Sequence, residues 1–378
     1  MTDSKPKKTK KPALGFFIIM LLPALGGYSI SRLAFQMTGF KASLPAFNAF
    51  DAFAILILIM VVLAIHELSH LMGGFTRGMK FLLFIVGPFQ WIKTADGIRF
   101  SLVFNPGSFG GLAAALPNPD QALAPQLKRL VVGGPLASLL LFILCMLVGM
   151  ALSGKPAFYF YFIGGFSLLI FLVTALPFRA GGFMSDGMQL LELMRGGVGV
   201  EERQIITNLM MQSMAGVRPR DLDQKVIDHM LRFESLDPMR QVIARYYAYI
   251  SQSDRGEHDL ASEYIAWLEQ HIDQYPQGFR QSLTLEICLN YLLRDNLEEA
   301  REWMKKSTGG IVDESRRALI EAEFALSEND KDRARELLGK ARKLSSRSYD
   351  NGLRIMTLEQ VALAEKKLEK TDQVSTTG

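Results

Sequence analysis

The chain has 378 residues, of which 49% are hydrophobic and 21% charged, and its formal net charge is +4. This length allows two or three domains, and so small a positive charge argues against a nucleic-acid-binding protein. The only two cysteines, Cys145 and Cys288, lie in an apolar and a charged stretch, so the sequence predicts neither a disulfide framework nor a cysteine metal site. Residues 1–195 are apolar overall, whereas residues 197–372 are charged and read as a soluble helical region.

Several apolar stretches are long enough to cross a bilayer, which takes about 20 mainly apolar residues. Four qualify, at roughly 13–31, 52–74, 130–152 and 157–177. The first follows a basic tail, residues 1–12, which holds five lysines. A cleaved signal peptide is an alternative for this stretch, but its length favours a retained anchor. We therefore expect about four transmembrane helices.

The basic residues predict how these helices are oriented, because lysine and arginine favour the cytoplasmic side of a membrane. The lysines of the tail place the N-terminus in the cytoplasm. The other basic residues next to the predicted spans then also lie inside: Arg77, Lys80, Lys128, Arg129 and Arg179. The pattern predicts a multi-pass protein of the cell membrane whose N-terminus and C-terminal region are both cytoplasmic.

The motif "HELSH", at 66–70, closes the second predicted span. Residues four apart share one face of a helix, so His66 and His70 can bind one cation. Glu67 is placed to act as general base on a metal-bound water. Zinc is the natural ion, because it accepts nitrogen and oxygen ligands and leaves one position open for water in catalytic sites. The alternative, two hydrogen-bonded histidines in a helical bundle, leaves the carboxylate of Glu67 unpaired in lipid.

A third ligand is required, and Asp186 is the best candidate. It follows the fourth span on the cytoplasmic side, where the histidine pair is expected. The remaining histidines all lie in the charged half of the chain: His229, His258 and His271. The alternative role for Asp186 is that of N-cap for the helix that follows, a role that Ser185 can also fill.

Three motifs together resemble the site-2 protease family of intramembrane zinc metalloproteases. They are "HELSHLMGG", "GGPLAS" at 133–138 and "LP…SDG" at 176–187, and their order and membrane placement match the family. The resemblance covers roughly residues 50–195. It implies that His66, His70 and Asp186 bind Zn²⁺ and that Glu67 is the catalytic base. It also implies a membrane-protein substrate that is cut within or beside a transmembrane segment.

Two residues depart from the pattern of that family, and the spacing from Pro177 to Asp186 is longer than usual. Thr174 and Ser138 stand where the family usually has asparagines. The first asparagine is thought to help hold the substrate carbonyl. We therefore treat Thr174 and Ser138 as candidate contacts for the oxyanion or the substrate. Weaker oxyanion support costs about 2.7–4 kcal/mol, so the departures bear on turnover more than on metal binding.

The segment between the second and third spans predicts β structure. Residues 87–105 contain an "ADG" turn and apolar residues that alternate on one strand face: Ile98, Phe100, Leu102 and Phe104. Two interpretations stay open: a free strand edge that pairs with an extended substrate, or a structural hairpin on the membrane surface. Residues 105–119 are rich in Gly and Pro and predict a re-entrant or interfacial loop.

The C-terminal region predicts amphipathic helices. "LLRDNLEEAREWM" (292–304) and "LSENDKDRARELL" (326–338) align at a period of 34 residues, and residues 254–268 form a weaker copy. The region loosely resembles tetratricopeptide repeats. Either it binds a peptide or protein partner on a concave surface, or it is a helical bundle that only stabilises the membrane part.

These patterns predict a mainly α fold: a membrane domain at 13–195 with a β-hairpin insert, a linker at 196–217, a repeat domain at 218–372 and a disordered tail at 373–378. The leading functional hypothesis is an intramembrane zinc endopeptidase whose cytoplasmic repeats recruit a substrate or regulator. The alternative is a catalytically weak or inactive membrane scaffold derived from such a protease, although a scaffold does not need Glu67. A metal transporter is a third, weaker hypothesis.

Overall fold

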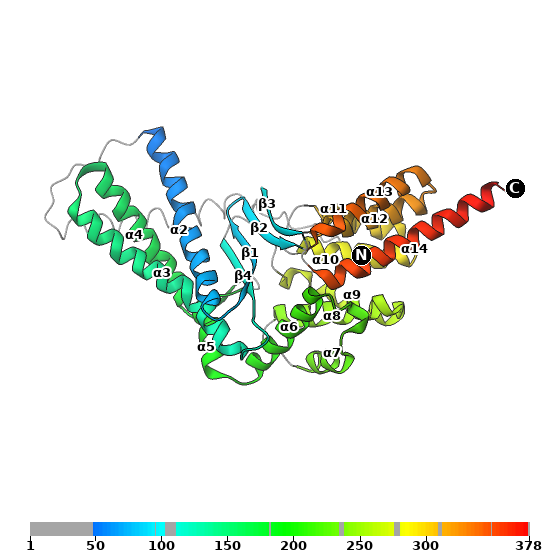
Figure 1. Cartoon of the computed structure of the whole chain (residues 1–378), viewed down its shortest axis with the longest axis horizontal. Helices are drawn as coiled ribbons and strands as arrows, with labels where there is room; N and C mark the ends of the chain where they lie inside the picture. Colours follow the sequence, from blue (N-terminus) through cyan, green and yellow to red (C-terminus); the bar gives the residue numbers. More distant parts are fainter. Residues whose placement is uncertain are drawn as a thin grey trace, which may run out of the picture.

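The structure is a computed structural model that describes residues 48–94, 96–102, 111–180, 183–233, 238–275, 280–308, 312–348 and 350–376. It is mainly α-helical, with one small β-sheet between two groups of helices (Figure 1). Among these residues, three helices are long and apolar enough to cross a membrane: α2 (Ala49–Phe75), α3 (Leu123–Ala151) and α4 (Gly154–Ala175). They correspond to three of the predicted spans. The first predicted span and the basic tail lie outside the described residues.

Helices α2 and α3 approach each other closely because glycines line their contact. A Cβ at Gly133 would lie 2.1 Å from the carbonyl oxygen of Ser69, and one at Gly73 would lie 2.2 Å from that of Arg129. The glycines of "HELSHLMGG" and "GGPLAS" therefore allow backbone-to-backbone contact at the end of α2 that carries the histidines. Large apolar side chains on the outer faces of these helices are exposed, as expected for lipid contact: Phe53, Ile57, Leu140, Leu144 and Leu172.

A polar contact around the buried Asp51 joins the N-terminal ends of α2 and α4. Asp51 accepts hydrogen bonds from Lys155 Nζ at 2.8 Å and from Tyr159 Oη at 2.5 Å. Asp51 also completes a capping box with Asn48 at the start of α2. Because this contact fixes where α2 begins, it helps to set the position of the histidines near the other end.

The four-stranded antiparallel sheet has the order β3-β2-β1-β4. Its strands are β1 (Lys80–Val86), β2 (Phe89–Thr94), β3 (Gly97–Leu102) and β4 (Gly111–Leu116). Pairing of β2 with β3 confirms the predicted hairpin. The prediction of a loop over 105–119 is wrong for residues 111–116, which form β4. These residues, mostly glycine and alanine, lack a strand pattern of their own, and pairing with β1 makes them a strand.

One face of the sheet is apolar and exposed. Phe84, Trp91 and Phe100 face one another across β1, β2 and β3, with ring centroids 5.5 and 5.0 Å apart. Ile98 and Leu102 share the exposed face of β3 with Phe100, as the sequence predicted, whereas Phe104 lies outside the described residues. The sheet follows α2 directly in the chain.

The rest of the chain is helical. A two-stranded hairpin, β5 (Arg179–Ala180) and β6 (Phe183–Met184), connects α4 to α5. The helices are α5 (Asp186–Arg195), α6 (Val198–Ala215), α7 (Gln224–Leu231), α8 (Pro238–Arg255), α9 (His258–Gln270), α10 (Arg280–Leu293), α11 (Leu297–Lys306), α12 (Glu314–Ser327), α13 (Lys331–Leu344) and α14 (Asn351–Thr376). Helices α5 and α6 lie between the membrane helices and the remaining C-terminal helices (Figure 1).

The C-terminal helices form successive pairs, α8 with α9, α10 with α11 and α12 with α13. Ala261, Ala300 and Ala334, which the repeat alignment matched, are all buried between helices. Asp295 and Asn329, 34 residues apart, both adopt positive φ in the turns within two of these pairs. These features agree with a repeat of this period, but assignment to the tetratricopeptide family stays a prediction.

The expected linker and tail are largely helical. The linker, residues 196–217, contains α6, whose Ile206 and Leu209 belong to the main core of the C-terminal helices. Helix α14 continues to Thr376, into the expected tail. The domain boundaries themselves stay predictions.

Candidate metal centre

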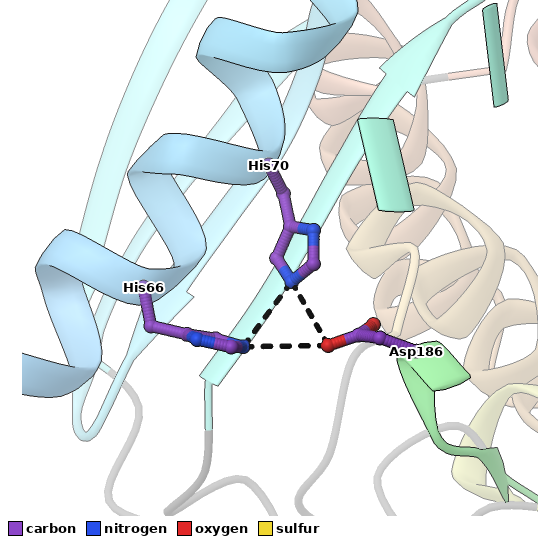
Figure 2. A group of neighbouring side chains, drawn as sticks. All are labelled: His66, His70 and Asp186. Atoms are coloured by element: carbon purple, nitrogen blue, oxygen red, sulfur yellow. Dashed lines mark hydrogen bonds and ion pairs between the residues drawn. The ribbon is translucent and has the colours of Figure 1, made fainter. Parts of the chain in front are cut away.

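Three candidate ligands from two helices meet at one point (Figure 2). His66 and His70 lie on α2, and their Nε2 atoms are 3.2 Å apart. Asp186 is the first residue of α5, and its Oδ2 lies 3.5 and 3.4 Å from these two nitrogens. Tetrahedral zinc with bonds of 2.0–2.1 Å separates its ligand atoms by about 3.3–3.4 Å. The observed triangle therefore fits a zinc ion at its centre.

Hydrogen bonds of the other ring nitrogens bear on the tautomers. His70 Nδ1 lies 2.8 Å from the carbonyl oxygen of Leu130, which can only accept, so Nδ1 donates and Nε2 carries a lone pair. His66 Nδ1 lies 2.8 Å from Ser138 Oγ, a hydroxyl that can accept from the imidazole or donate to it. When Ser138 accepts from His66 Nδ1, both Nε2 atoms carry lone pairs directed toward the Asp186 carboxylate. A cation between these three atoms would stabilise that arrangement, as in a metal site.

The candidate ligands are shielded from solvent. His66 is 3% exposed and His70 is 8% exposed, so a cation bound there would be held in a medium of low dielectric constant. A Cβ at Gly134 would lie 2.2 Å from His70 Nε2 and 2.8 Å from His66 Cε1. Glycine at this position of α3 therefore leaves room for both imidazoles.

Each residue of the "SDG" sequence, 185–187, has a separate structural role. Ser185 is the N-cap of α5: its Oγ accepts from the Met188 amide at 3.2 Å and donates to the Leu176 carbonyl at 2.6 Å. Of the two predicted N-cap candidates, Ser185 fills the role, which leaves the Asp186 carboxylate to face the histidines. A Cβ at Gly187 would lie 1.9 Å from the carbonyl oxygen of Ala175, so only glycine lets α5 start against the end of α4.

The charge state of Asp186 suits a metal ligand. Burial by itself would raise the pKa of this carboxyl, but its interactions with the imidazoles of His66 and His70 outweigh burial and lower the pKa below its ordinary value. Asp186 is therefore ionised at neutral pH, as a ligand oxygen must be.

Glu67 lies between the candidate ligands and the sheet. Its carboxylate is near enough to interact electrostatically with His66, His70 and Asp186. A Cβ at Gly111 would lie 2.2 Å from Glu67 Oε1, so the carboxylate lies directly against the backbone of the first residue of β4. The sequence did not reveal this contact, because nothing local to residues 111–116 indicates a strand.

Comparison with known protein families indicates what kind of protein carries this site. The family model described as peptidase family M50 matches residues 54–363, which include both histidines, Glu67 and Asp186. The chain belongs to peptidase family M50. Members of this family are zinc metallopeptidases, so membership supports a membrane-associated metallopeptidase. The match extends beyond residues 50–195, on which the resemblance rested. Searches of curated proteins and of solved structures returned no match.

Two further candidate residues of this M50 protein have different surroundings. Ser138 is buried, and its hydroxyl contacts the candidate ligand His66. It therefore orients an imidazole, a role that the sequence analysis missed, and any contact with substrate stays a prediction. Thr174, near the end of α4, has a buried Oγ1 without a hydrogen-bond partner among the described residues. That hydroxyl has an unused capacity to donate.

The other histidines of the M50 protein lie in the C-terminal helices, apart from this cluster. His229 lies 3.3 Å from Glu201, and His271 stacks on Trp267 with ring centroids 3.7 Å apart. His258 begins α9. Within the described part of the chain, the candidate metal cluster therefore consists of His66, His70 and Asp186.

Proposed function

We propose that this M50 protein is an intramembrane zinc endopeptidase that cleaves transmembrane or membrane-adjacent segments of other membrane proteins. The observation that carries the proposal is the convergence of His66 Nε2, His70 Nε2 and Asp186 Oδ2 at the spacing of zinc ligands. Both histidines lie on a helix that is apolar enough to cross a bilayer. A hydrolytic site in that position acts on substrates that reach it within or beside the membrane.

In this proposal His66, His70 and Asp186 hold the metal, and Glu67 performs the proton transfers. When bound, zinc supplies a Lewis acid that lowers the pKa of a coordinated water and polarises a peptide carbonyl. Glu67 accepts a proton from the attacking water and delivers it to the nitrogen of the leaving amine. Its position next to all three ligands, and against Gly111, suits both transfers.

Strand β4 is the surface on which we place the substrate backbone. A helical substrate buries its scissile bond within hydrogen bonds, so it has to unwind before cleavage. Strand β4 is an edge of the described sheet, with β1 as its only strand partner there, and it begins beside Glu67. An extended peptide added to this edge would gain backbone hydrogen bonds next to the catalytic base.

The proposed topology keeps the N-terminus and the C-terminal helices in the cytoplasm. The end of α2, the start of α3 and the end of α4 lie at the end of the membrane part where α5 begins (Figure 1). The basic residues of the positive-inside pattern occur at these same helix ends: Arg77, Lys80, Lys128, Arg129 and Arg179.

The C-terminal helices offer a place for a cytoplasmic substrate segment or regulator, which we also propose. A cavity of about 510 Å³ lies among α8, α10, α12 and α14. Its lining combines leucines, such as Leu293 and Leu363, with charged side chains, such as Arg220, Glu359 and Lys366. This mixture suits a peptide more than a wholly apolar ligand. Loss of cleavage in a Leu363→Asp variant that still binds zinc would support binding of a substrate segment or regulator in this cavity.

The scaffold alternative rests on Thr174 and Ser138, which stand where the family usually has asparagines. A single hydroxyl is a weaker oxyanion donor than a carboxamide. Cleavage of a membrane-anchored reporter decides between the two functions. The protease proposal expects cleavage by the unchanged protein and none by Glu67→Gln, with zinc bound to both. Zinc binding without cleavage by either protein would favour the scaffold.

A further inference from the structure

Helix α5, which begins with the candidate ligand Asp186, is held on two sides. On the membrane side, Leu193 is buried against Leu127 and Val131 of α3. The other side faces the C-terminal helices. There, Glu192 is 9% exposed and lies among three arginines. They are Arg240 of α8, Arg203 of α6 and Arg179 of β5.

Arg240 makes the shortest of these contacts. From α8 it donates through Nη2 to Glu192 Oε1. Through Nη1 it donates to Glu202 Oε2 of α6 at 3.1 Å and to the Gly199 carbonyl at 2.6 Å. The other two arginines are 3.5 and 3.6 Å from Glu192. One guanidinium therefore joins α8 to both α5 and α6.

The charges explain why this bridge matters. Glu192 and Glu202 are both buried, and the planar guanidinium satisfies one oxygen of each. Without Arg240, Glu192 would keep Arg203 and Arg179 at 3.5 and 3.6 Å but lose the guanidinium nearest to it, and α8 would lose its link to both carboxylates. Breaking a buried ion pair from one side is destabilising, because the remaining charge is less well compensated. We expect α5 and α6 to move apart in response.

Movement of α5 would reach the candidate metal site directly. Asp186 precedes Glu192 by six residues, about 9 Å along the helix axis, and the ion pairs of its carboxylate within the described part of the chain are those with the two histidines. Its position is therefore set by the helix it begins.

We infer that Arg240 is a positioning residue for the metal site: through Glu192 it holds α5 so that Asp186 completes the ligand set. Metal binding in the membrane part then depends on the docking of the C-terminal helices, and a partner that displaces α8 weakens it. The inference rests on the metal site proposed above.

The chain offers a matched control in Arg316 and Glu286. Arg316 of α12 donates to both carboxylate oxygens of Glu286 of α10, at 2.7 and 2.8 Å. Their side chains are 7% and 6% exposed, against 8% and 9% for Arg240 and Glu192. The control pair lies wholly within the C-terminal helices. Removing this ion pair should lower the stability of the fold without changing any contact of α5.

The experiment measures zinc affinity in the full-length protein in detergent, by competition with a chelating dye. All variants carry Glu67→Gln to prevent self-cleavage. Arg240→Ala should bind zinc about 10–100-fold more weakly, the usual effect of losing an outer partner of a metal site. Arg240→Lys, which can pair with one carboxylate, should be intermediate. Arg316→Ala should stay within about threefold of the parent, although its melting temperature falls.

Two results would overturn the inference: a folded Arg240→Ala protein with the affinity of the parent, or an equal loss of affinity in Arg316→Ala. If Arg240→Ala does not fold, Arg240→Lys and Arg316→Lys make the same comparison and decide it. If the parent protein binds no zinc, the proposed metal site itself is overturned. This outcome differs from those that overturn only the role of Arg240.

Discussion

The membrane part and the C-terminal helices each bury a polar cluster, but the two clusters differ in how their atoms are paired. Arg316 donates to both oxygens of Glu286, and Tyr249 Oη donates to the Glu286 carbonyl at 3.2 Å. Each of these donors meets an acceptor. His66, His70 and Asp186 instead direct two ring nitrogens and a carboxylate oxygen at one common centre, as metal ligands do.

This difference separates a structural cluster from a functional one. Burial raises the pKa of Tyr249 well above its usual range, so the phenol stays protonated and keeps donating within its cluster. The donors of the C-terminal cluster thus have their acceptors within the cluster, whereas the membrane cluster has a ligand set that a cation would complete. Buried polar groups of similar exposure therefore have different roles, and the pairing of donors with acceptors distinguishes them.

The largest expected effect is that of Glu67→Gln on cleavage. The amide keeps the shape of the side chain but cannot accept the proton of the attacking water. Cleavage of a membrane-anchored reporter should fall by about 10²–10⁴-fold, the usual share of general acid–base catalysis. Zinc content, measured in the same preparations, should be unchanged. Equal cleavage by the two proteins would remove Glu67 from the mechanism.

Gly111→Ala should reduce cleavage by up to about 10²-fold, the cost of displacing a catalytic group by roughly 1 Å. The new methyl group would overlap the Glu67 carboxylate, which has to move. Gly339→Ala is the matched control, because a Cβ at that position meets nothing within 4 Å. Reporter cleavage should separate the two variants, and equal rates would contradict the packing of Glu67 against β4.

Ser138→Ala should weaken zinc binding about 10–100-fold, because it removes the hydroxyl that orients His66. Ser167→Ala is a suitable control. Ser167 is also a buried helix serine, but its Oγ donates to the Ile163 carbonyl of its own helix at 2.7 Å. Dye competition should show weaker binding for the first variant only. Unchanged affinity in Ser138→Ala would mean that the hydroxyl does not support the ligand.

Arg316→Ala should have the smallest effect on cleavage. Removing one partner of a buried pair costs about 3–5 kcal/mol of fold stability, and the Glu286 carboxylate is left without its guanidinium. Thermal unfolding should shift downward while reporter cleavage, assayed well below the transition, stays near that of the unchanged protein. A loss of cleavage as large as that of Glu67→Gln would erase the distinction between the two clusters.

The sequence predicted the candidate metal site more completely than it predicted the fold around that site. The spacing of His66 and His70 predicts a shared helix face, and the position of Asp186 beyond an apolar stretch predicts its side of the membrane. Both depend on local pattern alone. Three of the four predicted spans and the β2–β3 hairpin followed from pattern in the same way.

The missed features all depend on contacts between distant residues. Strand β4 exists because β1 pairs with it, and its Gly111 matters because Glu67 packs on it. The bridge from Arg240 to Glu192 joins residues 48 positions apart. Local sequence periodicity does not indicate such a contact, so the sequence predicted the candidate ligands but not the groups that position them.

Zinc content tests the central claim most directly. The full-length protein, purified in detergent without added chelator, should hold close to one zinc per chain by elemental analysis. His66→Ala and Asp186→Asn should each lose most of it, because a tetrahedral site with three protein ligands retains only two. Full zinc occupancy in both variants, or a folded parent free of zinc after incubation with the ion, would contradict the account.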